Sequence, residues 1–259
     1  MRKVFLISIL GLILTVSPAY AALRSNITTR TTNLASRAAM ITQKQEQVSQ
    51  DLRQRAQTEI TRRINFLNQE ITLINAMRKL SATDKSNLQA QIQMQIDGLN
   101  SLQTKINSDT DNATLRTDVN SIISNYYIFL FFRVQVNLLA ASDRMSTTTD
   151  ELTAIYTKLQ TRINQTQAAG NDVTSVNALL SDMNAKLADA ATQCQAAQAK
   201  LTPLTAPGYP GNKITLEDAR TMIKTGLTDI KTAYQDALQI RQQLQGFKNT
   251  NPQSSPSAI

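Results

Sequence analysis

The sequence predicts an all-α protein, an elongated antiparallel helical bundle of five or six helices with coiled-coil-like hairpins. Apolar residues recur at steps of three and four along most of the chain, which is the spacing of one helix face. No Gly or Pro lies between residues 22 and 97, so no residue there ends a helix by its backbone conformation alone. The one alternating stretch, residues 133–139, lies inside a longer helical pattern and predicts no strand.

The first 21 residues have the three-part order of a secretory signal peptide. Arg2 and Lys3 form a basic start, residues 4–16 are apolar, and Ala19-Tyr20-Ala21 is an A-x-A cleavage site. The apolar run is shorter than the roughly 20 residues that a helix needs to span a bilayer. We therefore expect cleavage after Ala21 and export to the periplasm or the outside of the cell.

The chain after residue 21 begins with a segment of different character. Residues 22–40 are rich in Ser, Thr, Asn and Arg without a sustained period, and they predict a flexible arm. The helical bundle domain is expected over residues 41–247, and a disordered tail with two prolines over residues 248–259.

The bundle domain opens with a predicted helical hairpin. An apolar stripe between Val48 and Ile74 predicts a helix over residues 41–79. Ser81 followed by Asp84 approximates a capping box and predicts a return helix over residues 82–107. The short turn between the two helices makes them antiparallel neighbours.

Three or four further helices are expected after this hairpin. One begins near Ala113, and a capping box of Thr148 and Glu151 predicts a restart or kink at residues 143–149 before a helix that Gly170 ends. The last helix is expected to be capped by Thr215 with Asp218. Between these lies the most regular seam, with apolar residues in strict 3-4 alternation: Val173, Val176, Leu180, Met183, Leu187, Ala190, Cys194, Ala197 and Leu201.

The composition argues against an enzyme. The 259 residues contain no His, which excludes Ser-His-Asp, Cys-His and zinc-His sites. The single cysteine, Cys194, lies on the apolar seam and is expected to be a buried core residue, with an intermolecular disulfide as the alternative. Asp109 and Asp111 have the spacing of a calcium loop but lack its further ligands. We expect no cofactor and no bound metal.

The positive charge favours anionic partners. The formal net charge is +8, and removal of Arg2 and Lys3 with the signal peptide lowers it to +6. Basic residues are spread out and rarely interleaved with aromatic residues, so nucleic acid is not an expected partner. One basic ridge on the first helix is a candidate contact for an anionic surface, with a plain solvated helix face as the favoured alternative. It consists of Arg53, Arg55, Arg62 and Arg63.

A second candidate is the most apolar segment after the signal peptide. Its aromatic residues are Tyr126, Tyr127, Phe129, Phe131 and Phe132. The segment is either a helix buried by its neighbours or an element that inserts into lipid. We favour burial, because Arg133 follows directly and keeps the apolar span well below the bilayer thickness.

Three segments resemble a group of exported, all-helical bacterial proteins. These segments are residues 80–85 (Leu-Ser-Ala-Thr-Asp-Lys), residues 138–144 (Leu-Leu-Ala-Ala-Ser-Asp-Arg) and residues 206–212 (Ala-Pro-Gly-Tyr-Pro-Gly-Asn). The resemblance implies export and an apolar third helix. The group has no known activity, so it implies no functional residues.

These observations lead to one main hypothesis and two alternatives. The main hypothesis is a non-enzymatic exported helical scaffold or interaction protein, with a protein partner or self-association. The first alternative is a membrane-active protein that exposes the apolar helix 122–141 to lipid. The second is a small-ligand carrier with a cavity between helices.

Overall fold

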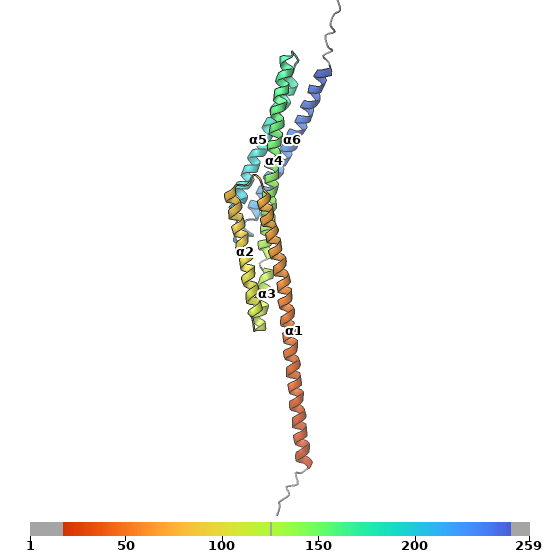
Figure 1. Cartoon of the computed structure of the whole chain (residues 1–259), viewed down its shortest axis with the longest axis vertical. Coiled ribbons are helices and arrows are strands. Elements are labelled where there is room, and N and C mark those ends of the chain that lie inside the picture. The colour runs from red at the N-terminus through yellow and green to blue at the C-terminus, as the bar shows by residue number, and fades with distance from the viewer. Residues whose placement is uncertain (1–17, 125, 250–259) are drawn as a thin grey trace, which may run out of the picture. The chain divides into compact units, whose positions relative to one another are not determined.

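The computed structural model describes residues 18–124 and 126–249, which form helices joined by short turns, with no strand (Figure 1). This confirms the predicted all-α class and helical bundle. The predicted signal peptide up to residue 17 and the tail from residue 250 lie outside the described residues. The elements in chain order are α1 (Pro18–Ala76), α2 (Ala82–Ser108), α3 (Asn112–Ser124), α4 (Tyr126–Ala168), α5 (Thr174–Leu201), the 3₁₀ turn η1 (Ala206–Gly208) and α6 (Lys213–Asn249).

The chain divides into two compact units, one ending at Gln54 and the other beginning at Arg55. In the first unit, the described residues belong to α1. This differs from the expected irregular arm over residues 22–40, because that range is helical. Threonine hydroxyls donate to the carbonyl four residues back, as from Thr28 to Arg24 at 2.8 Å and from Thr42 to Ala38 at 3.1 Å. The hydroxyl groups that weaken the helical pattern in the sequence are thus accommodated within the helix.

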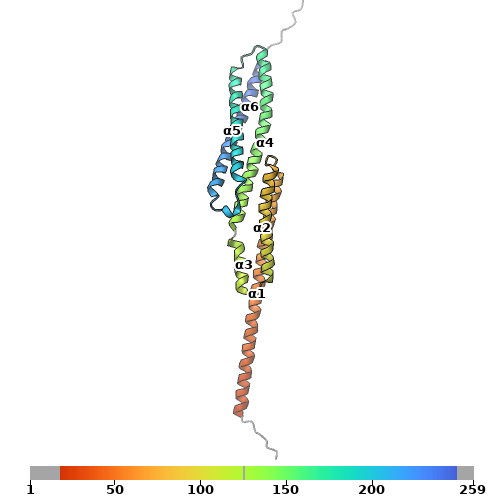
Figure 2. The same ribbon diagram turned by 90° about the vertical axis from the view of Figure 1, so that its left-hand side faces the viewer.

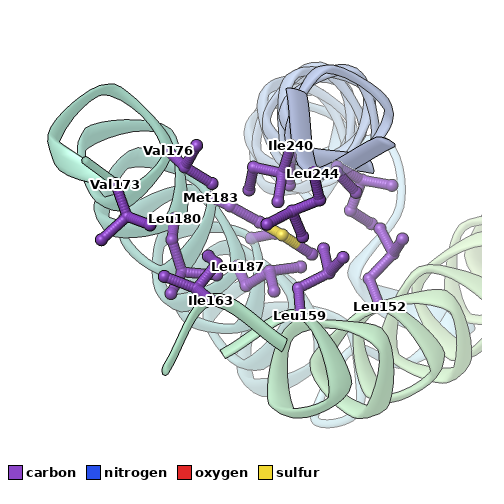
Figure 3. Close-up of a cluster of buried hydrophobic side chains, with 14 of the residues drawn as sticks. Leu152, Leu159, Ile163, Val173, Val176, Leu180, Met183, Leu187, Ile240 and Leu244 are labelled. Carbon is purple, nitrogen blue, oxygen red and sulfur yellow. The ribbon is translucent and has the colours of Figure 1, made fainter. Parts of the chain in front are cut away.

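The core of the second unit includes a cluster between α4, α5 and α6, which lie side by side (Figure 2). Figure 3 shows Leu159 and Ile163 of α4 pointing toward Met183 and Leu187 of α5, with Ile240 of α6 on the opposite side. The predicted 3-4 seam of α5 is buried from Val173 to Leu201. Cys194 lies within it as a free, buried thiol, with its Sγ 3.1 Å from the Ser142 hydroxyl, which confirms its prediction as a core residue.

The other part of the second unit contains the predicted hairpin. Helix α2 begins after Ser81, whose hydroxyl accepts the backbone N–H of Asp84 at 3.0 Å. The amide of Gln89 donates to Asn75 of α1 at 2.6 Å. The N-cap and the antiparallel pairing of α1 with α2 therefore follow the sequence prediction.

One predicted helix break is absent, and one predicted helix start is displaced. Helix α4 runs through residues 143–149 without the predicted restart, because the Thr148 hydroxyl donates to the Arg144 carbonyl at 3.1 Å within the helix. Helix α6 begins at Lys213, before the expected Thr215 cap, and Asp218 pairs instead with Lys200 at 3.2 Å. Gly170 ends α4 as predicted, with a φ of +85°.

Candidate functional site

Arg63 connects three elements of the second unit. It projects from α1 with a side chain only 6% exposed, and its Nε donates to Glu59 Oε1 at 2.9 Å. Its Nη1 donates to the backbone carbonyl of Ile122 in α3. The guanidinium carbon lies 4.6 Å from the centroid of the Phe129 ring in α4. These contacts satisfy a buried charge with one anion, one carbonyl and one aromatic face.

A surface pocket of about 170 Å³ lies beside this arginine. Phe66 packs edge-on against Phe129, with ring centroids 6.3 Å apart, and forms an apolar wall. The charged residues that line the pocket are Glu59, Arg62, Arg63 and Arg133. Drug-sized ligands occupy pockets of about 300–1,000 Å³. The pocket thus fits a small anionic group better than a whole organic ligand.

Two carboxylates on α1 near these arginines have opposite electrostatic environments. Burial raises the pKa of Glu59, but hydrogen bonds and charges from Arg62 and Arg63 outweigh it and hold the pKa below the usual value. Burial raises the pKa of Glu70 to about 7, against a smaller lowering by the charge of Arg133. Glu70 Oε2 is buried and makes no hydrogen bond to the described residues.

The aromatic segment of α4 is mostly buried. Phe129, Phe131 and Phe132 are core residues, while Tyr127 is more than a third exposed; the side chain of Tyr126 lies outside the described residues. This agrees with the favoured interpretation of the segment as core. The Tyr127 ring stacks on Tyr209 from the loop around η1, with centroids 6.4 Å apart. The sequence did not predict this contact, which joins residues far apart in the chain.

The predicted basic ridge does not form one exposed face. Arg53 belongs to the first unit, and the other three residues belong to the second. Arg55 and Arg62 are exposed on α1, whereas Arg63 is buried in the contacts described above. Glu59 and Arg63 form an ion pair four residues apart on α1, with Arg63 Nε 2.9 Å from Glu59 Oε1.

In the first unit, helix α1 is exposed on all sides over residues 23–47, and one side of it carries large apolar residues that the 3-4 spacing did not reveal. The most exposed large apolar side chains of this unit, 55–66% exposed, are Leu23, Ile27, Leu34, Met40 and Ile41. Ile27, Leu34 and Ile41 are seven residues apart, so they share one side of the helix. A search for a seven-residue period, rather than for 3-4 spacing, identifies this face from the sequence.

The described residues include one candidate membrane span and no cluster of metal-binding side chains. They contain no group of three or more His, Cys, Asp or Glu residues able to hold a metal ion. The range Asn112–Ala168, which includes α3 and α4, is long and apolar enough by composition to cross a membrane, and half of its most apolar window is buried inside the protein. A core helix of a soluble protein has the same properties.

Searches of protein-family models, curated proteins and solved structures give no match to this chain.

Proposed function

We propose that this chain is a non-enzymatic, exported interaction protein that acts through a helical surface. The observation that carries the proposal is the exposed apolar face of the first unit, where large side chains are more than half exposed. A group of large, exposed apolar side chains on one side of a helix is a candidate interaction site. The three-part N-terminal segment supports export, and the lack of His supports a non-enzymatic role.

Site-directed labelling in cells tests the proposal. Leu34→Cys places a thiol on the exposed face, and Met94→Cys places one at an equally exposed position of α2. Background labelling is low, because burial of the only native thiol, Cys194, raises its pKa. A membrane-permeant maleimide is applied both to the purified protein and to the cells that produce it.

A partner bound to this face slows labelling of Leu34→Cys in cells relative to the purified protein, with no such change for Met94→Cys. Equal rates in cells and in purified protein for both variants would contradict the proposal. The comparison detects whether the face is covered, whatever covers it.

A further inference from the structure

The exposed face of the first unit has a regular apolar stripe. Ile27, Leu34 and Ile41 follow one another at seven residues, and Leu23 precedes Ile27 by four. Both spacings keep side chains on one side of a helix. All four side chains are more than half exposed. We call this set the exposed stripe.

A row of basic residues flanks the exposed stripe. Arg30, Arg37 and Lys44 each follow a stripe residue by three positions, so they line one edge of it. No acidic residue lies between residues 22 and 45. The face is therefore apolar along its centre and positive along its flank, with no internal counter-charge within this range. We call these three residues the basic row.

A second copy of the chain does not complement this face. If Ile27, Leu34 and Ile41 occupy the d positions of a parallel coiled coil, Leu23 and the basic row occupy the g positions. The basic row would meet the partner's e positions, which include Ala35 and Thr42, and find no carboxylate there. The a positions hold Arg24, Thr31, Ala38 and Gln45, so the seam would contain one large apolar residue per heptad. An anionic partner satisfies the basic row, and a second copy does not.

We propose that residues 23–45 bind the surface of an anionic lipid bilayer. The exposed stripe enters the boundary between headgroups and acyl chains, and the basic row lies among the lipid phosphates. A lipid surface needs no interlocking side chains, so it accepts a stripe with one large apolar residue in every two helical turns. With four basic residues, including Arg24, the helix lies on the bilayer and does not span it. This inference rests on the proposed function and specifies its partner.

Vesicle co-sedimentation of the purified full chain tests the inference, with the N-terminus established by mass spectrometry. The probes are phosphatidylcholine vesicles with and without about 30% phosphatidylglycerol. The variant R30Q/R37Q/K44Q should reduce partitioning to the anionic vesicles about a hundredfold, because each basic residue near such a surface contributes about a factor of five. The control R220Q/K224Q/K231Q removes the same charge from exposed positions of α6 and should change partitioning much less.

A second matched pair of variants tests the contribution of the apolar side chains to vesicle binding. L34S/I41S removes two residues of the exposed stripe, and M94S/I214S removes two side chains of similar exposure outside it. Only L34S/I41S should weaken binding to anionic vesicles. Since all four side chains are mostly solvent-exposed, the variants should fold, and circular dichroism at 222 nm checks their helix content.

Three results would overturn the inference. One is no binding of the wild type to anionic vesicles, and another is equal loss of binding in the test and control variants. The third is a dimer mass by light scattering that depends on Leu34 and Ile41, which would assign the face to a second copy. If Leu34→Cys is nevertheless protected in cells, the proposed function stands and its partner is a macromolecule other than lipid.

Discussion

Replacement of Glu70 by Gln should stabilise the protein at neutral pH, although it removes a charge near Arg133. Glu70 is only 7% exposed, and its Oε2 makes no hydrogen bond to the described residues. Burial raises its pKa from 4.5 to about 7, against the opposing charge of Arg133. An ionised carboxylate at this place is therefore less favourable in the folded protein than in the unfolded chain.

The sign of the pH dependence follows from proton linkage. Below pH 4.5, the folded and the unfolded chain both hold the proton, and the carboxyl group has no effect on stability. Between 4.5 and about 7, the unfolded chain releases the proton while the folded chain retains it, so the free energy of unfolding falls as the pH rises. Above about 7 the loss is complete and constant.

The pKa difference of about 2.5 sets the size of the effect. It corresponds to at most about 3.4 kcal/mol, and relaxation and water penetration around the ionised carboxylate reduce the expected gain in Glu70→Gln to about 1–2 kcal/mol at pH 8. Because the chain contains no Trp, urea unfolding is followed by circular dichroism at 222 nm. The free energies of unfolding of the variant and the wild type should differ at pH 8 and converge near pH 4.

Glu59→Gln provides a matched control on the same helix. Burial raises the Glu59 pKa, but Arg62 and Arg63 outweigh it and lower the pKa below 4.5, so the ionised group stabilises the fold. This contribution is present above pH 4.5 and is lost as the pH falls through the lowered pKa. Glu59→Gln should therefore destabilise the protein at pH 8. A Glu70→Gln effect that is independent of pH, or has the same sign as the Glu59→Gln effect, would refute the reasoning.

Three further predictions concern the fold. Ser81→Ala removes the N-cap of α2 and should cost about 1 kcal/mol in urea unfolding, whereas Ser86→Ala within the same helix should cost much less. Met183→Ala opens a cavity in the α4–α5–α6 core and should cost about 2–5 kcal/mol, measured in the same way. Cys194 should react with a thiol reagent only when urea unfolds the protein; rapid reaction in the absence of urea would show that its burial is incorrect.

Sequence patterns predicted the helix faces and helix ends that depend on residues close together in the chain. The seam of α5 is buried as its 3-4 spacing indicates, because two apolar residues per heptad are enough to cover one helix face. Ser81 and Gly170 mark real helix ends, since their effect depends on adjacent backbone groups. Thr148 failed as such a marker because its hydroxyl can also bond within a continuous helix.

The arginine site could not be predicted from spacing alone. Arg63 meets the Ile122 carbonyl and the Phe129 ring, which are about sixty residues away in the chain. Spacing along the chain assigns Arg63 to a basic ridge and Phe129 to a separate aromatic segment. Each assignment used only neighbours along the helix, whereas the contact between them depends on how α1, α3 and α4 pack.

The density of apolar residues explains why the heptad pattern of α5 is buried and that of the N-terminal part of α1 is exposed. In α5, Val176, Leu180, Met183 and Leu187 supply two apolar residues per heptad, and the described neighbours bury them. The exposed stripe of α1 supplies one large residue per heptad, with polar or small residues between. Burying such a face against another helix also removes water from the basic row, which costs free energy. The few apolar side chains that become buried offset only a small part of this cost. An anionic bilayer avoids this cost, because it accepts the apolar side chains and leaves the basic groups at a charged, hydrated boundary.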